Sequence, residues 1–70
     1  MKLSARNQLK GKIIEIQEGA VNGIVKLDIG GGNIISSVIT MSSLRQLGLK
    51  VGGTAYAVIK ASNVMIGVED

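Results

Sequence analysis

Apolar and polar residues alternate along most of this 70-residue chain, and glycines interrupt the alternation. Because successive side chains of a β-strand point to opposite faces of a sheet, a period of two predicts strands. The alternation is cleanest at residues 20–29, where one face carries Val21, Gly23, Val25, Leu27 and Ile29. The pattern therefore indicates a protein built mainly from short strands joined by glycine turns.

Five strands and one short helix are expected along the chain. The strands are predicted at residues 10–18, 20–29, 33–40, 54–60 and 64–68. Gly30, Gly31 and Gly32 form a turn after the second strand, because glycine adopts positive φ without a Cβ clash. The helix covers residues 43–47, and the hydroxyl of Thr40 or Ser42 can cap its start.

This order of elements predicts an all-β fold, a five-stranded OB-like Greek-key barrel with one short helix between strands 3 and 4. An SH3-like barrel or a small open sheet would give a similar pattern. The length allows a single domain, residues 1–70.

The third strand carries aliphatic side chains on both of its faces, with Ile34 and Val38 on one and Ile35 and Ile39 on the other. One set could lie under the helix and loops. Otherwise a monomer would expose a large apolar patch, which soluble monomers rarely do. Because a domain of this size also buries little surface on its own, we expect copies of the chain to associate.

The chain has eight Lys or Arg residues against five Asp or Glu, a formal net charge of +3, which favours anionic partners. A nucleic-acid-binding OB module is therefore the main alternative function. Tyr56 is the only aromatic residue, however, whereas single-strand binders normally stack bases on several aromatic rings. A small anion needs charge and hydrogen-bond donors but no rings, so it fits the composition better than nucleic acid.

Enzyme chemistry has little support in this sequence. Cys and His are absent, so no thiol or imidazole can act as a nucleophile or base, and disulfides and zinc clusters are excluded as well. No paired arrangement for acid–base catalysis is present among the acidic residues, which are Glu15, Glu18, Asp28, Glu69 and Asp70. We expect no catalytic residue and no direct protein ligand to a metal ion.

The first residues contain no apolar segment typical of a signal peptide. No apolar run approaches the roughly 18 residues of a membrane helix. The expected location is the cytoplasm, with no membrane partner.

Two segments combine a cation with hydroxyl or amide side chains and contain no carboxylate. Residues 4–8 hold Arg6, and residues 59–63 hold Lys60. A tetrahedral dianion accepts many hydrogen bonds, which Arg, Lys, hydroxyls and backbone N–H groups can donate. The alternative is that Arg6 and Lys60 are ordinary surface charges and that Ser4 and Asn7 shape a turn. Residue types alone leave both possibilities open.

The motifs in these segments resemble the opening and closing signatures of the molbindin (Mop domain) family. Residues 4–11 (Ser-Ala-Arg-Asn-Gln-Leu-Lys-Gly), 39–44 (Ile-Thr-Met-Ser-Ser-Leu) and 59–65 (Ile-Lys-Ala-Ser-Asn-Val-Met) match the family in order and spacing. The resemblance covers essentially the whole chain. The chain resembles the free-standing molbindins more than the related domains that are fused to regulators or transporter ATPases. A further alternative function is a subunit that senses the ligand and docks onto a regulator or transporter.

The resemblance implies storage of molybdate or tungstate at subunit interfaces for intracellular molybdenum or tungsten homeostasis, with no cofactor. It also implies a homohexamer, a trimer of dimers. By motif, one kind of site uses Ser4, Arg6, Thr40, Ser43, Lys60, Ala61 and Ser62. Arg6 and Lys60 would supply charge, the hydroxyls would donate hydrogen bonds, and Ala61 would donate its backbone N–H. A second kind of site, near a threefold axis, would use backbone groups of Gly19, Ala20 and Val21.

Overall fold

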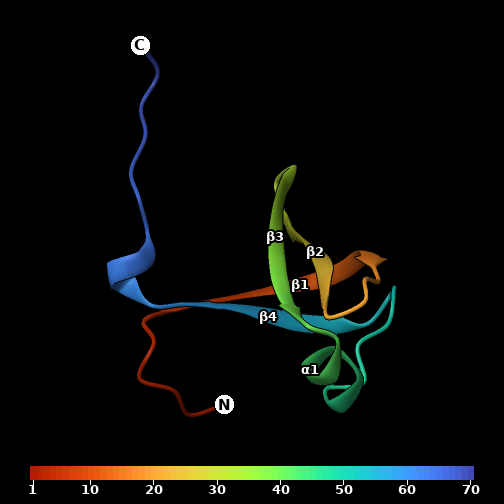
Figure 1. Ribbon diagram of the computed structural model, residues 1–70. Coiled ribbons are helices and arrows are strands. Elements are labelled where there is room, and N and C mark those ends of the chain that lie inside the picture. Colours follow the sequence, from red (N-terminus) through yellow and green to blue (C-terminus); the bar gives the residue numbers. More distant parts are fainter.

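Four of the five alternating segments form one antiparallel sheet in the computed structural model, which describes residues 1–70 (Figure 1). In chain order the elements are β1 (Asn7–Gln17), β2 (Asn22–Gly30), β3 (Asn33–Thr40), α1 (Met41–Gln46), β4 (Thr54–Ile59) and the 3₁₀ turn η1 (Ala61–Asn63). The predicted helix starts two residues earlier than expected, directly after its cap. Neither α1 nor η1 has the length and apolar character of a membrane-spanning helix.

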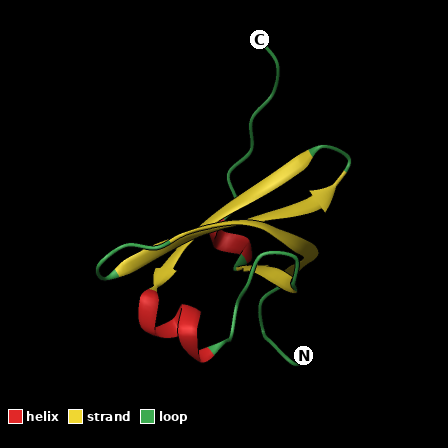
Figure 2. Cartoon of the chain, turned by 90° about the vertical axis from the view of Figure 1, so that its right-hand side faces the viewer, coloured by secondary structure: helices red, strands yellow, loops and turns green.

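The long first strand organises the sheet, whose order is β3-β2-β1-β4. Its first half pairs with β4, from Asn7 opposite Ile59 to Lys12 opposite Thr54. Its second half pairs with β2, and the register shifts between Ile13 and Glu15. A bulge of this kind bends a strand and increases its twist, so the two halves of β1 belong to different sides of a strongly curved sheet (Figure 2).

Glycine conformations end β2 as the sequence predicts. Gly30, Gly31 and Gly32 all have positive φ, at 96°, 62° and 79°, which side chains with a Cβ rarely adopt. Asp28 supports the turn, because its carboxylate accepts a hydrogen bond from the N–H of Gly30 at 2.9 Å.

The helix is capped by Thr40, whose hydroxyl oxygen accepts a hydrogen bond from the N–H of Ser43 at 3.0 Å. Its apolar side chains Met41 and Leu44 are buried against the inner face of the sheet. The complete core is small and consists of Ile13, Val25, Leu27, Met41, Leu44 and Ala57. On β3, Ile35 and Ile39 pack against this core, whereas Ile34 and Val38 are exposed.

The expected fifth strand, at residues 64–68, is not formed, and the count of five strands is wrong for this single chain. After η1 the chain runs extended and leaves the body of the molecule, as both ribbon views show (Figures 1 and 2). A strand needs a neighbour for its backbone N–H and C=O groups, and no strand of this chain lies beside the segment. The sheet therefore stays open, with one free edge at β3 and the other at β4.

Candidate functional site

The two cationic segments of the sequence leave the sheet side by side. Asn7 lies opposite Ile59 in the β1–β4 ladder, and the Asn7 side-chain amide donates a hydrogen bond to the Ile59 carbonyl oxygen at 3.1 Å. Arg6 directly precedes this pair and Lys60 directly follows it. We call the group formed by Ser4, Arg6, Lys60, Ala61 and Ser62 the cationic end. Figure 1 shows its red and blue segments leaving the same end of β1 and β4.

The backbone of η1 gives the cationic end free hydrogen-bond donors. The N–H of Asn63 donates to the Lys60 carbonyl at 2.8 Å, and that of Val64 to the Ala61 carbonyl at 3.3 Å. The N–H groups of Ala61 and Ser62 take no part in these bonds. The first N–H groups of a helical turn have no partner within the turn, so both can donate to an anion.

The positive charges of the cationic end are unpaired. The single ion pair of the chain joins Lys26 to Glu15, with 3.6 Å between Nζ and Oε2. Arg6, Lys60, Ser4 and Ser62 are all exposed. Their donors are therefore not occupied by a carboxylate of the same chain.

The remaining two residues of the predicted site lie elsewhere in the fold. Thr40 ends β3 opposite Asn22, and Ser43 lies in the first turn of α1. We call this pair the helix end. Figure 1 shows α1 at the opposite side of the molecule from η1. One chain thus places five of the seven residues at one end of the β1–β4 pair and holds the other two elsewhere.

The hydroxyls of the helix end are already ordered by the helix cap. The Thr40 hydroxyl donates to the Ser43 Oγ at 2.9 Å and accepts from the Ser43 N–H at 3.0 Å. Because the Thr40 donor is used within this pair, the Ser43 hydroxyl hydrogen is the one left to bind a ligand.

The loop of the predicted second site lies beside the helix end. Residues 19–21 connect β1 to β2, and the Val21 carbonyl accepts a hydrogen bond from the N–H of Met41, the first residue of α1, at 2.8 Å. A Cβ on Gly19 would overlap the Asn22 carbonyl oxygen. Gly19, Ala20 and Val21 are exposed. The sequence gives no sign of this link between loop and helix, because its partners are backbone atoms far apart in the chain.

Comparison with known proteins assigns the family. The TOBE domain model matches residues 3–66. A probable molybdenum-pterin-binding protein of Haemophilus influenzae is 58% identical over 69 residues, which cover 99% of this chain and 100% of the relative. The chain belongs to the TOBE-domain family of molybdenum-pterin-binding proteins. The family expected from the sequence motifs is thereby confirmed.

Two solved structures share the fold. MopII from Clostridium pasteurianum is 46% identical, with a TM-score of 0.89 over 96% of this chain and 100% of that chain. The cytoplasmic molybdate-binding protein ModG, solved with molybdate bound, is 51% identical with a TM-score of 0.92. That match covers 99% of this chain and 49% of ModG. The curled antiparallel sheet with one short helix is thus the fold of molybdate-binding proteins.

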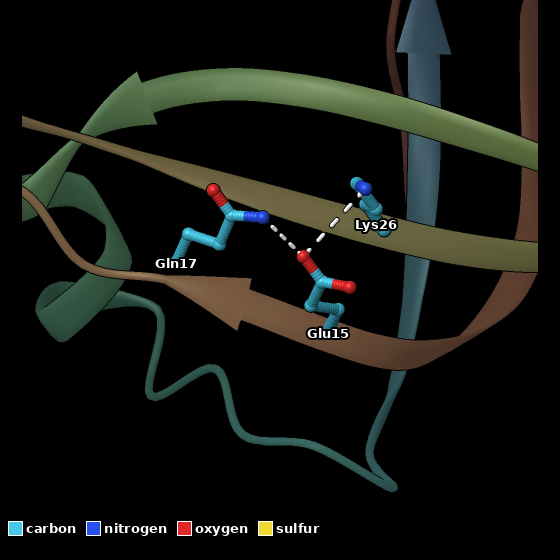
Figure 3. A network of polar contacts seen from close by, with 3 residues as sticks. All are labelled: Glu15, Gln17 and Lys26. Atoms are coloured by element: carbon cyan, nitrogen blue, oxygen red, sulfur yellow. Dashed lines mark hydrogen bonds and ion pairs between the residues drawn. The ribbon is translucent and has the colours of Figure 1, made fainter.

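A polar network on the outer surface of this TOBE domain involves other residues. Glu15 accepts a hydrogen bond from the Gln17 amide and pairs with Lys26 (Figure 3). The Gln17 hydrogen bond, followed by the positive charge of Lys26, lowers the pKa of the Glu15 carboxyl below its ordinary value. This network holds one carboxylate, one amide and one ammonium group but no second carboxylate. The chain has no cluster of acidic side chains that could hold a metal ion.

Asn7 is the residue of the site that reasoning from sequence missed. Its side-chain amide joins the start of β1 to the end of β4, and these are the strand ends next to Arg6 and Lys60. The Ser-Ala-Arg-Asn motif contains Asn7 and could have drawn attention to it.

Proposed function

We propose that this protein binds molybdate or tungstate reversibly at sites that form between copies of the chain. The observation that carries the proposal is that Arg6 and Lys60 flank the paired residues Asn7 and Ile59 at one end of β1 and β4, and that neither forms an ion pair with a carboxylate. Relatives described as molybdate-binding share this fold over nearly the whole chain, which supports the choice of ligand.

The cationic end matches the chemistry of a tetrahedral dianion. Arg6 offers a planar fork of N–H donors, and Lys60 offers a compact charge. Ser4 and Ser62 add hydroxyl donors, and the free N–H of Ala61 adds a backbone donor. Hydrogen bonds to a charged acceptor are about twice as strong as those between neutral groups, so a few donors suffice to hold the ion.

The separation of the helix end from the cationic end is our reason for placing the site between copies. A second chain can bring its Ser43 hydroxyl to the cationic end of the first, whereas the same chain holds it at the far side of the sheet. An anion bound between two chains stabilises their association by mass action. The assembly we propose is a homohexamer built as a trimer of dimers, with Gly19, Ala20 and Val21 lining a second kind of site.

The role we propose is storage in the cytoplasm for molybdenum or tungsten homeostasis, without catalysis. Selectivity against sulfate follows from size, because a cage spaced for the larger ion leaves a smaller one with unmade hydrogen bonds. Each buried donor left unpaired costs about 1–3 kcal/mol. Molybdate and tungstate are so similar in size that the same cage should discriminate weakly between them.

Calorimetric titration with molybdate, tungstate, sulfate and phosphate tests this function. We expect the first two ions to bind at least tenfold more tightly than the last two. The Arg6→Ala/Lys60→Ala variant should bind molybdate at least tenfold more weakly than the wild type. The control is Lys12→Ala/Lys50→Ala, which removes two exposed charges elsewhere and should leave the affinity almost unchanged. Equal losses in both double variants would contradict the assignment of the cationic end.

A further inference from the structure

The peptide unit that leads into Lys60 is held by a side chain of the neighbouring strand. The Asn7 amide donates a hydrogen bond to the Ile59 carbonyl oxygen at 3.1 Å, and this carbonyl belongs to the peptide bond between Ile59 and Lys60. Asn7 is half-buried and lies 52 residues away in the chain. The hydrogen bond therefore restrains the backbone at the point where the chain leaves β4 and enters η1.

The peptide unit that leads into Arg6 is held in the same way by the next residue of β1. The Gln8 amide donates a hydrogen bond to the Ala5 carbonyl oxygen at 3.1 Å, and this carbonyl belongs to the peptide bond between Ala5 and Arg6. Arg6 precedes the first residue of β1 and lies outside the β1–β4 ladder. The hydrogen bond therefore restrains a backbone segment that the sheet itself does not hold.

We propose that the amide side chains of Asn7 and Gln8 are positioning groups of the oxyanion site, which order the two cationic segments before the ion binds. This inference rests on the proposed function and adds residues that act through the cations rather than on the ion. Ordering a flexible backbone when a ligand binds costs conformational entropy, so a segment that is ordered beforehand binds the ligand more tightly. Each amide lowers this cost at one of the two charged residues of the cationic end.

Amides suit these two positions better than the carboxylates of the same shape. An Asn or Gln amide donates a hydrogen bond to a carbonyl oxygen, whereas an ionised Asp or Glu only accepts. A carboxylate would also place a negative charge beside the bound anion. Neither residues 1–14 nor residues 29–68 contain an Asp or Glu, so both cationic segments lie in parts of the chain without acidic side chains. Neutral donors thus order the backbone and leave the positive charge of the cationic end undiminished.

Backbone order parameters, measured by NMR relaxation without any oxyanion, test the positioning directly. Asn7→Ala should lower the order parameter of Lys60 towards about 0.6, the value of flexible backbone, and leave that of Arg6 unchanged. Gln8→Ala should lower the order parameter of Arg6 and leave that of Lys60 unchanged. Asn33→Ala is the matched control, because it removes a hydrogen bond of the same kind from the turn after β2, and it should affect neither. Unchanged order at the cationic end in both test variants would overturn the proposal, whether or not the protein binds an oxyanion.

Calorimetric titration with molybdate shows whether this order matters for binding. We expect Asn7→Ala to bind about tenfold more weakly than the wild type, the lower end of the effect of removing a group that orients a metal ligand. Asn33→Ala should bind as the wild type does. If Asn7→Ala lowers the order of Lys60 but keeps the wild-type affinity, the proposal is wrong.

The pH profile of Asn7→Asp separates positioning from a merely structural role. A protonated carboxyl group can donate to the Ile59 carbonyl oxygen, whereas an ionised one cannot. Relative to the wild type at the same pH, the affinity of Asn7→Asp should rise as the pH falls through the pKa of the new carboxyl and should exceed that of Asn7→Ala. A relative affinity that stays at or below that of Asn7→Ala at every pH would overturn the proposal. A wild type with ordered cationic segments that binds no oxyanion would contradict the proposed function, and the positioning role with it.

Discussion

Replacement of Thr40 by alanine tests whether the helix end is organised as the structure shows. The variant removes the hydroxyl that accepts the Ser43 N–H at 3.0 Å and donates to the Ser43 Oγ at 2.9 Å. Both groups are at the protein surface, so water can replace the lost cap in part. Loss of an N-cap of this kind costs about 1 kcal/mol of the free energy of unfolding.

The consequence reaches the core, because α1 contributes Met41 and Leu44 to the six buried hydrophobic side chains. For a domain of 60–100 residues, a loss of about 1 kcal/mol corresponds to a fall in Tm of about 4–8 °C. The free energy of unfolding is measured in urea at one fixed protein concentration, because association of copies raises the apparent stability.

Thr40→Ser is the matched control, because serine keeps the hydroxyl and caps helices at least as well as threonine. We expect Thr40→Ser to unfold close to the wild type and Thr40→Ala to be less stable by about 1 kcal/mol. If the two variants are equally stable, the cap hydrogen bond does not hold α1, and the position of Ser43 needs another explanation.

Two further predictions concern the packing and the electrostatics of the sheet. Gly23→Ala should lower the free energy of unfolding in urea by about 1–3 kcal/mol, because a Cβ there would lie 2.9 Å from the Met41 sulfur and 3.2 Å from the Gln17 carbonyl oxygen. Gly67→Ala is the control, because a Cβ at that position would meet no atom within 4 Å, and it should lower the free energy far less. Equal losses in the two variants would contradict the close contact at Gly23. Gln17→Ala should raise the pKa of Glu15 towards its ordinary value, as measured by the pH dependence of its carboxyl ¹³C shift, because the Gln17 hydrogen bond is the largest cause of the lowered pKa. Since folding lowers the pKa of Glu15, the ionised carboxylate stabilises the folded state slightly above its ordinary pKa, and this stabilisation is lost as the pH falls through the pKa of the folded state. An unchanged Glu15 pKa in Gln17→Ala would contradict the assigned cause.

Much of the sheet could be predicted from the sequence because its signal is local. Alternation and glycine turns identify four strands, and the predicted bounds of β3 (Asn33–Thr40) agree with the structure. The sequence predicts the start of β1 at residue 10, three residues later than the structure shows, because Asn7 and Gln8 pair with β4 but show no apolar alternation. The prediction of a fifth strand is wrong for a single chain for a related reason. Periodicity shows that residues 64–68 favour a strand, but not whether the chain places another strand beside them.

The candidate site was less accessible from residue types alone. Arg6 and Lys60 are ordinary surface cations until the register of β1 and β4 brings them together. The motif resemblance drew attention to both, but it gave no indication that the same chain holds Thr40 and Ser43 apart from them. Chain position carries no information about that separation, because it depends on the curvature of the sheet and the position of α1.

If one oxyanion site takes its donors from two chains, mixing two variants with different defects should restore it. Arg6→Ala/Lys60→Ala removes the charges of the cationic end, and Ser43→Ala removes the hydroxyl of the helix end. The two proteins are unfolded together, refolded as a mixture, and titrated with molybdate.

In a symmetric pair of copies, random mixing places an intact cationic end beside an intact helix end at about a quarter of the sites. We expect the mixture to regain wild-type affinity at about that fraction of sites, although neither variant has it alone. A mixture that binds molybdate no better than the average of its two components would show that one chain supplies the whole site.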